Sequence, residues 1–200
     1  MTDLDGLVER VILASASPRR QELLRLVISD FDVVPSAFDE SQVAENLAPA
    51  DHVLYSSQMK ARDVAERYPD SLVIAADTVV VIDGKILGKP ADRSDAARML
   101  RMLGGRTHEV YTGVTVRKGQ TERSGSECTC VTFRELADEM VSRYVSSGEP
   151  LDKAGAYAIQ GRGTVLVSSI EGCYFNVVGL PLFRLSVLLE DFGVEVLADA

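Results

Sequence analysis

Residues 12–26 have the sequence ILASASPRRQELLRL, in which an apolar run passes directly into a helical pattern. Val11 to Leu13 predict a short buried strand. Ser17 is a favourable helix N-cap, and Pro18 suits the first helical position because the N–H that proline lacks would have no partner there. We therefore expect a strand followed by a helix that begins at Pro18.

The start of this expected helix has the chemistry of an anion-binding site. Backbone N–H groups without intrahelical partners and the positive end of the helix dipole meet there. Arg19 and Arg20 add two guanidinium groups whose geometry matches phosphate oxygens. Arginine in a first turn also opposes the helix dipole, which disfavours a purely structural role. The segment predicts a phosphate site, and a solvated basic face is the alternative.

Composition limits the classes of partner. The 200 residues, 46% of them hydrophobic, suffice for one domain or for two small lobes that share a cleft. A net charge of −9 disfavours non-specific attraction to DNA, RNA or anionic membranes. The odd set Cys128, Cys130 and Cys173 predicts reduced thiols rather than zinc or disulfides. Because no signal core or membrane-length apolar segment is visible, we expect one cytoplasmic domain over residues 1–200.

Helical and strand patterns alternate along the chain without strict βαβ regularity, which predicts an α/β fold with a mixed sheet flanked by helices. The expected strands cover residues 31–40, 72–83, 85–90, 108–116, 127–133 and 164–181. The expected helices cover residues 51–68, capped by Asp51, and 92–103, 136–145 and 182–189. The Asp83-Gly84 pair predicts a type I′ turn, and the glycine-rich residues 152–163 predict a loop close to a ligand.

Asp77 interrupts the apolar run LVIAADTVVVI of residues 72–82. An unpaired carboxylate buried there would cost several kcal/mol, so Asp77 must be protonated, hydrogen-bonded or next to a cation or metal. Catalytic and metal-binding carboxylates share this setting. The structural alternative is a strand-end Asp that accepts backbone N–H bonds, while Thr78 fits an ordinary strand residue.

Four other residues carry weaker signals. Lys89, in the sequence GKP, is placed to reach a phosphate or to pair with Asp77. Lys60 and Glu40 each fit a solvated surface residue when taken alone. Gln160 fits a loop amide, although its amide can also bond to the edge of a base. Two carboxylates, two lysines and an arginine pair together outline a polyphosphate site with Mg²⁺ or Mn²⁺ bound through oxygen.

Histidine-based and covalent mechanisms are disfavoured. His52 and His108 stand alone in the sequence, and each fits a structural role better than a catalytic one. No serine or cysteine is accompanied by a recognisable histidine partner, which argues against a covalent triad.

Six blocks of the chain resemble, in order, the motifs of the Maf (septum formation inhibitor) family of nucleoside triphosphate pyrophosphatases. They are SASPRR (15–20), AADTVV (75–80), GKP (88–90), GRTHEVYTGV (105–114), DKAGAYAIQG (152–161) and NVVGLPL (176–182). The resemblance implies an elongated mixed sheet in two lobes with a central cleft, similar to inosine triphosphate pyrophosphatases. It also implies a homodimer and metal-dependent hydrolysis of a nucleoside triphosphate to the monophosphate and pyrophosphate, with Mg²⁺ or Mn²⁺, or else Co²⁺, as the metal.

The resemblance assigns roles to individual residues. Asp77 is implied as the proton acceptor, and Glu40 and Asp77 as ligands of the metal. The implied phosphate-binding residues are Ser15, Ser17, Arg19, Arg20, Lys60 and Lys89. The residues implied in base choice are Arg19, Thr78 and Gln160.

The loop form DKAGAYAIQG resembles the subgroup that acts on dTTP and UTP rather than the subgroup that prefers 7-methyl-GTP. Ala158 stands where the family usually has glycine, and GRGT follows Gln160 in place of a GLGG-like run. Modified pyrimidine nucleotides therefore stay open as substrates. Two alternatives also stay open: a nucleotide-sensing regulator of cell division with little catalysis, and a house-cleaning enzyme for purine nucleotides such as ITP.

Overall fold

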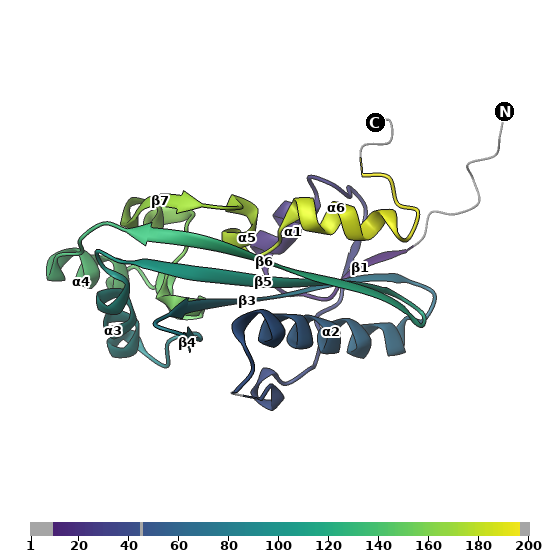
Figure 1. Ribbon diagram of the computed structural model, residues 1–200, viewed down its shortest axis with the longest axis horizontal. Helices are drawn as coiled ribbons and strands as arrows, with labels where there is room; N and C mark the ends of the chain where they lie inside the picture. Colours follow the sequence, from purple (N-terminus) through teal and green to yellow (C-terminus); the bar gives the residue numbers. More distant parts are fainter. Residues whose placement is uncertain (1–9, 45, 197–200) are drawn as a thin grey trace.

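The computed structural model describes residues 10–44 and 46–196, and these form a mixed seven-stranded sheet flanked by helices (Figure 1). The strand order is β2-β1-β3-β5-β6-β7, with β4 paired to β3. β1 is parallel to β2 and β3, and the other pairs are antiparallel. The strands are β1 (Val11–Leu13), β2 (Asp32–Val33), β3 (Leu72–Ile82), β4 (Lys85–Leu87), β5 (Thr107–Lys118), β6 (Thr121–Phe133) and β7 (Val167–Glu171).

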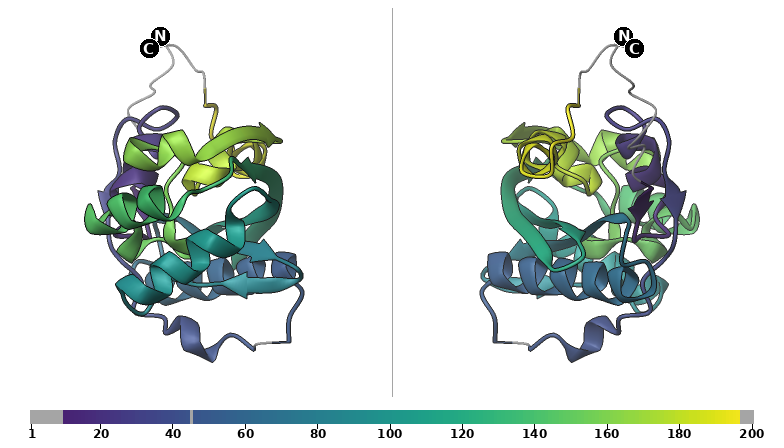
Figure 2. Two further views of the ribbon diagram at one scale, coloured as in Figure 1. Left: turned by 90° about the vertical axis from the view of Figure 1, so that its left-hand side faces the viewer. Right: turned by 90° about the vertical axis from the view of Figure 1, so that its right-hand side faces the viewer.

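Helices cover both faces of this sheet. The long helix α2 packs on one face against β3 and β5, and α5 and α6 pack on the other against β5 and β6 (Figures 1 and 2). The α-helices are α1 (Pro18–Leu24), α2 (Pro49–Arg67), α3 (Arg93–Leu103), α4 (Asp138–Ser146), α5 (Tyr174–Val178) and α6 (Leu182–Glu190). The short 3₁₀ helices are η1 (Glu40–Gln42), η2 (Glu149–Asp152), η3 (Ala154–Ala156) and η4 (Gly161–Leu166). Every helix in the described ranges is too short or too polar to cross a lipid bilayer.

The central strand β3 joins two apolar clusters, one at each end of the sheet. Ala76 belongs to the cluster built with α1 and α6, and Val80 belongs to the cluster built with α3 and α4. Asp77 and Thr78 lie between these two positions. The expected two-lobe architecture is therefore confirmed, and polar residues of β3 fall where the two lobes meet.

Helix α2 approaches the sheet closely at Gly113 of β5. A Cβ atom at this position would lie 2.3 Å from the backbone carbonyl oxygen of Val53. Gly113 is also the register partner of Asp77. Lys60 lies about two turns beyond Val53 and hence on the same helical face. The absence of a side chain at Gly113 thus lets α2 bring Lys60 down beside β3.

Several predicted elements are confirmed. Asp83 and Gly84 both have positive φ, as a type I′ turn requires, and Asp92 caps α3 through its side chain. The antiparallel strands β5 and β6 and the terminal helix α6 also form as expected.

Several predicted boundaries are wrong. Strand β6 begins at Thr121 rather than at residue 127, and β4 ends at Leu87 rather than at residue 90. The strand expected over residues 31–40 is only β2, because Pro35 cannot donate to a ladder, so Glu40 lies on η1 instead of at a strand end. Asp51 does not cap α2: the helix begins at Pro49, which is favoured at a first helical position, and Ala48 is the N-cap residue. The strand expected over residues 164–181 holds β7 but then gives way to α5.

Candidate active site

A cleft of about 740 Å³ opens beside β3 and the start of α1. All residues that the sequence predicts for the site line it, namely Ser15, Ser17, Arg19, Arg20, Glu40, Lys60, Asp77, Thr78, Lys89 and Gln160. They come from six separate parts of the chain, so the fold gathers them across long sequence separations.

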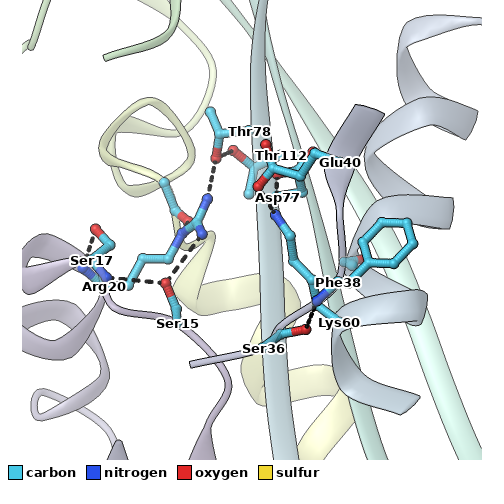
Figure 3. A network of polar contacts seen from close by, with 12 residues as sticks. Ser15, Ser17, Arg20, Ser36, Phe38, Glu40, Lys60, Asp77, Thr78 and Thr112 are labelled. Atoms are coloured by element: carbon cyan, nitrogen blue, oxygen red, sulfur yellow. Dashed lines mark hydrogen bonds and ion pairs between the residues drawn. The ribbon is translucent and has the colours of Figure 1, made fainter. Parts of the chain in front are cut away.

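Lys60 is the cation that accompanies Asp77 (Figure 3). The Lys60 Nζ donates to Asp77 Oδ1 and to Glu40 Oε1, at 2.6 Å each. The Lys60 and Asp77 side chains are each 10% exposed, whereas Glu40 is 57% exposed. Lys60 is therefore not the solvated helix lysine that its position alone suggested. The ammonium compensates the buried carboxylate, which meets the requirement that the sequence places on Asp77.

Arg20 is held in a fixed orientation across the cleft (Figure 3). Its Nε donates to the backbone oxygen of Gly179 at 2.8 Å, and its Nη1 and Nη2 donate to the hydroxyls of Ser15 and Thr78 at 3.3 and 3.0 Å. The Thr78 hydroxyl also bonds to Thr112 at 2.9 Å. Burial lowers the pKa of Arg20, opposed by the negative charges of Asp77 and Glu40. Two of the five guanidinium N–H groups stay available for an incoming anion.

The expected cap of α1 is confirmed. Ser17 Oγ accepts a bond from the backbone N–H of Arg20 at 3.5 Å, and Pro18 occupies the first position of the helix. Ser15 Oγ accepts from the backbone N–H of Ser17 at 3.2 Å. Both serine oxygens therefore hold the turn, while their hydroxyl hydrogens can be donated to an oxyanion.

Three of the predicted residues, unlike Arg20 and Lys60, have side chains that are not engaged in hydrogen bonds or ion pairs within the described part of the chain. Among residues 10–44 and 46–196, the side chains of Arg19, Lys89 and Gln160 make no hydrogen bond or ion pair within the chain, although all three line the cleft. Lys89 does not pair with Asp77, since Lys60 takes that place. The three side chains are the ones most available to a ligand.

The model of the family described as Maf-like protein matches residues 10–192. The chain belongs to this family. A protein of Moorella thermoacetica named dTTP/UTP pyrophosphatase is 52% identical over 94% of this chain and 98% of its own length. A Methanosarcina mazei protein of the same name is 49% identical over 96% of this chain and 99% of its own. A Staphylococcus aureus Ham1 protein structure aligns with a TM-score of 0.46 at 15% identity, covering 65% of this chain and 73% of that one.

The cleft of this Maf-family chain also contains residues that the sequence did not single out. Phe38 packs edge-on against Tyr55, with ring centroids 6.5 Å apart, two residues before Glu40. Asp152 and Lys153 also line the cleft and bond to each other. Burial raises the pKa of Asp152, but the bond and charge of Lys153 outweigh it and leave that pKa lowered. The start of the DKAG motif could have pointed to this pair.

The donor set of the Maf-family cleft suits a cation that arrives with its substrate. Glu40 and Asp77 converge on one point, since both lie 2.6 Å from the same Lys60 nitrogen. Within the described ranges, no three His, Cys, Asp or Glu side chains are grouped so that they could hold a metal ion. Mg²⁺ is usually bound through one or two carboxylates with phosphate oxygens and water completing the shell. Two converging carboxylates beside a predicted phosphate site fit this pattern.

The two histidines differ in their surroundings. His108 is buried against Phe133, and its Nε2 lies 2.8 Å from the Tyr157 hydroxyl. Burial lowers the pKa of His108 to about 4, so it is neutral near pH 7, which agrees with a structural role. His52 lines the cleft from α2, where its buried Nδ1 has no partner among the described residues. The three cysteines are free thiols.

Proposed function

We propose that this chain hydrolyses nucleoside triphosphates, with dTTP and UTP foremost, to the monophosphate and pyrophosphate. The observation that carries the proposal is the buried Asp77 carboxylate, held by Lys60 in a cleft shared with the fixed guanidinium of Arg20. The names of relatives about half identical over nearly the whole chain support the same reaction.

Asp77 orients the attacking water and accepts its proton. Its Oδ1 is bonded to Lys60, and its Oδ2, which has no hydrogen bond among the described residues, is the atom we assign to the water. The water then attacks the α-phosphorus, the bond to the β-phosphate oxygen breaks, and pyrophosphate leaves with the electron pair of that bond. Lys60 keeps the carboxylate in place throughout, and its charge also lies near the reacting phosphate.

Cationic side chains stabilise the charge that develops on pyrophosphate. Arg20 is preorganised by three bonds to the chain, so it does not reorient during the reaction. Arg19 and Lys89 line the same cleft without a side-chain hydrogen bond or ion pair in the described ranges, and we assign them to the phosphates. Ser15 and Ser17 donate their hydroxyl hydrogens to phosphate oxygens at the start of α1.

Glu40 and Asp77 would hold the divalent cation, which is Mg²⁺ or Mn²⁺, with Co²⁺ as the alternative. When bound, the cation would polarise the phosphate and neutralise part of its charge. The exposed Glu40 carboxylate can turn from Lys60 toward the cleft with little cost, because its bond is largely solvated. Glu40 thus serves either the ammonium or an arriving cation, whereas Asp77 keeps its Oδ1 bond to Lys60.

Gln160 provides the amide for base recognition, and Arg19, which also lines the cleft, assists it. A site that bonds to the polar edge of a pyrimidine rejects a purine, because buried polar groups then lose their partners. Thr78 acts on base choice indirectly, since its hydroxyl is engaged by Arg20 and Thr112.

The test is pyrophosphate release by the purified chain. The panel contains dTTP, UTP, CTP, modified pyrimidine triphosphates, ATP, GTP, 7-methyl-GTP and ITP, each with Mg²⁺, Mn²⁺, Co²⁺ or a chelator. We expect fastest release from dTTP and UTP and none with the chelator. Nucleotide binding without pyrophosphate release under any metal would instead indicate a regulator, and faster release from ITP would indicate a purine house-cleaning enzyme.

We further propose a homodimer and a cytoplasmic location. The resemblance to the family supports the dimer, and α6 presents Phe183 with 74% of its surface exposed. Three free thiols suit a reducing compartment. Light scattering after size-exclusion chromatography measures the oligomeric state, and a monomer at micromolar concentration would contradict the dimer.

A further inference from the structure

The segment that presents Gln160 to the cleft is fixed from behind by two residues outside the cleft. We define residues 158–163 as the Gln160 loop. The Glu149 carboxylate accepts bonds from the backbone N–H groups of Arg162 and Gly163, at 3.0 Å each. The Tyr144 hydroxyl donates to Glu149 at 2.9 Å and accepts from the backbone N–H of Ala158 at 3.1 Å. Both sides of Gln160 are thereby attached to one hydrogen-bonded pair.

The Gln160 loop wraps tightly around this pair. A Cβ atom at Gly163 would lie 2.2 Å from the Ala158 carbonyl oxygen and 2.7 Å from the Tyr144 hydroxyl. Gly161 has a φ of +67°, and a Cβ there would lie 2.8 Å from Glu149 Oε2. The two glycines let the backbone close on the carboxylate, so the position of Gln160 follows from that of Glu149.

Charge strengthens the attachment. Burial raises the pKa of Glu149, but bonds from the N–H groups of Arg162 and Gly163 and from the Tyr144 hydroxyl outweigh it and leave that pKa lowered. Glu149 is therefore ionised near neutral pH, and its three bonds are charge-assisted. Burial raises the pKa of Tyr144, which stays a protonated donor.

We propose that Glu149 and Tyr144 are positioning residues for base selection, which they control by holding the Gln160 loop at a fixed distance from the phosphate site. The inference rests on the proposed function, because it takes Gln160 as the base-reading residue. Neither residue touches the phosphate-binding side chains through any hydrogen bond in the described ranges. Their loss should therefore change the discrimination between bases more than the rate of hydrolysis.

The experiment compares Glu149→Gln, Tyr144→Phe and the double variant with the wild type. Glu149→Gln replaces one acceptor oxygen by an NH₂ group, and Tyr144→Phe removes the hydroxyl without changing the ring. The matched controls are Glu139→Gln and Tyr174→Phe, whose side chains are exposed and form no hydrogen bond among the described residues. Melting temperatures are recorded for all variants.

The readout is the ratio of kcat/KM for UTP to kcat/KM for GTP. We expect this ratio to fall about tenfold or more in each single variant, with kcat for UTP within about threefold of wild type. The double variant should lose no more discrimination than either single variant, because both changes break one network. The controls should keep the wild-type ratio.

An unchanged ratio with a lowered melting temperature would reduce the pair to a structural role and overturn the inference. An equal fall of kcat/KM for both nucleotides would do the same. Dissociation constants of α,β-methylene UTP and GTP are measured in parallel, so base selection is also observed without hydrolysis. A wild type that binds selectively but releases no pyrophosphate contradicts the proposed function alone. A wild type that hydrolyses dTTP and UTP selectively, with the same selectivity in Glu149→Gln and Tyr144→Phe, contradicts the inference alone.

Discussion

At the scale of single residues, Asp77 is the group on which the reaction depends. We expect Asp77→Asn to lower turnover by orders of magnitude, because the amide cannot accept a proton from water. The fold should persist, since Lys60 keeps its bond to Glu40 and the amide oxygen still accepts from Nζ. Pyrophosphate release and circular dichroism measure the two effects. Near-normal release from a folded variant would remove Asp77 from the mechanism.

Lys60 has a structural role that Lys89 lacks, although both are predicted phosphate contacts. Lys60→Met leaves the Asp77 carboxylate buried without its ammonium, which should lower the free energy of unfolding by about 3–5 kcal/mol. Asp77→Asn in the same chain should recover much of that loss. Lys89→Met is the matched control and should leave stability unchanged. Urea titration measures all three, and an equal effect of both lysine variants would refute the distinction.

The need for a partner at Asp77 could be predicted from the sequence, but the identity of that partner could not. A carboxylate in an apolar strand requires compensation wherever it occurs. Which lysine supplies it depends on where α2 lies on the sheet, a long-range contact that local patterns do not encode. Arg20 could be predicted as a phosphate contact from its position in the first turn of a helix, which is a local feature. Its bond to Gly179 could not, because that bond depends on the distant turn after α5.

At the scale of elements, the docking of α2 on β5 depends on one glycine. Gly113→Ala should push α2 off the sheet, because the new Cβ would meet the Val53 carbonyl, and overpacking of this kind costs about 1–3 kcal/mol. The shift should also separate Lys60 from Asp77 and reduce kcat. Gly125→Ala on β6 is the control, since its new Cβ would meet only the flexible Arg184 side chain. Loss of stability without loss of kcat would show that the pair tolerates movement of the helix.

The type of an element could be predicted where a regular apolar pattern extends over many residues, as in α3 and β5. The prediction was wrong where tertiary contacts determine the element. Residues 174–178 have the aromatic and β-branched composition of a strand. They form α5 because Asn176 is buried and donates through its side chain to the Val110 carbonyl and to Thr129. The long-range hydrogen bonds of a buried polar side chain thus outweigh the weak strand propensity of its neighbours. The sequence pattern alone does not identify the partners of those bonds.

At the scale of the whole molecule, His108 should set the dependence of stability on pH between about 6.5 and 4.5. Its pKa is about 4 in the folded state and near 6.5 in the unfolded chain. Below pH 6.5 the unfolded state therefore binds more protons, and the free energy of unfolding falls by at most about 1.4 kcal/mol per pH unit. Stability from His108 is thus complete above pH 6.5 and lost progressively toward pH 4.

Two partly buried carboxylates with lowered pKa values contribute mainly below that window. Glu122 and Glu149 have lowered pKa values, because the hydrogen bonds and opposite charges around them outweigh a burial contribution that alone would raise the pKa. Their contribution to the free energy of unfolding is therefore lost mainly as the pH falls below the usual carboxyl pKa of about 4.3.

Urea unfolding at pH 7.5, 6.5, 5.5 and 4.5 is compared between wild type and His108→Phe. The variant loses the bond to Tyr157 at every pH, so the decisive quantity is the slope, which should be clearly smaller in the variant. Equal slopes would place the acid sensitivity of the fold elsewhere.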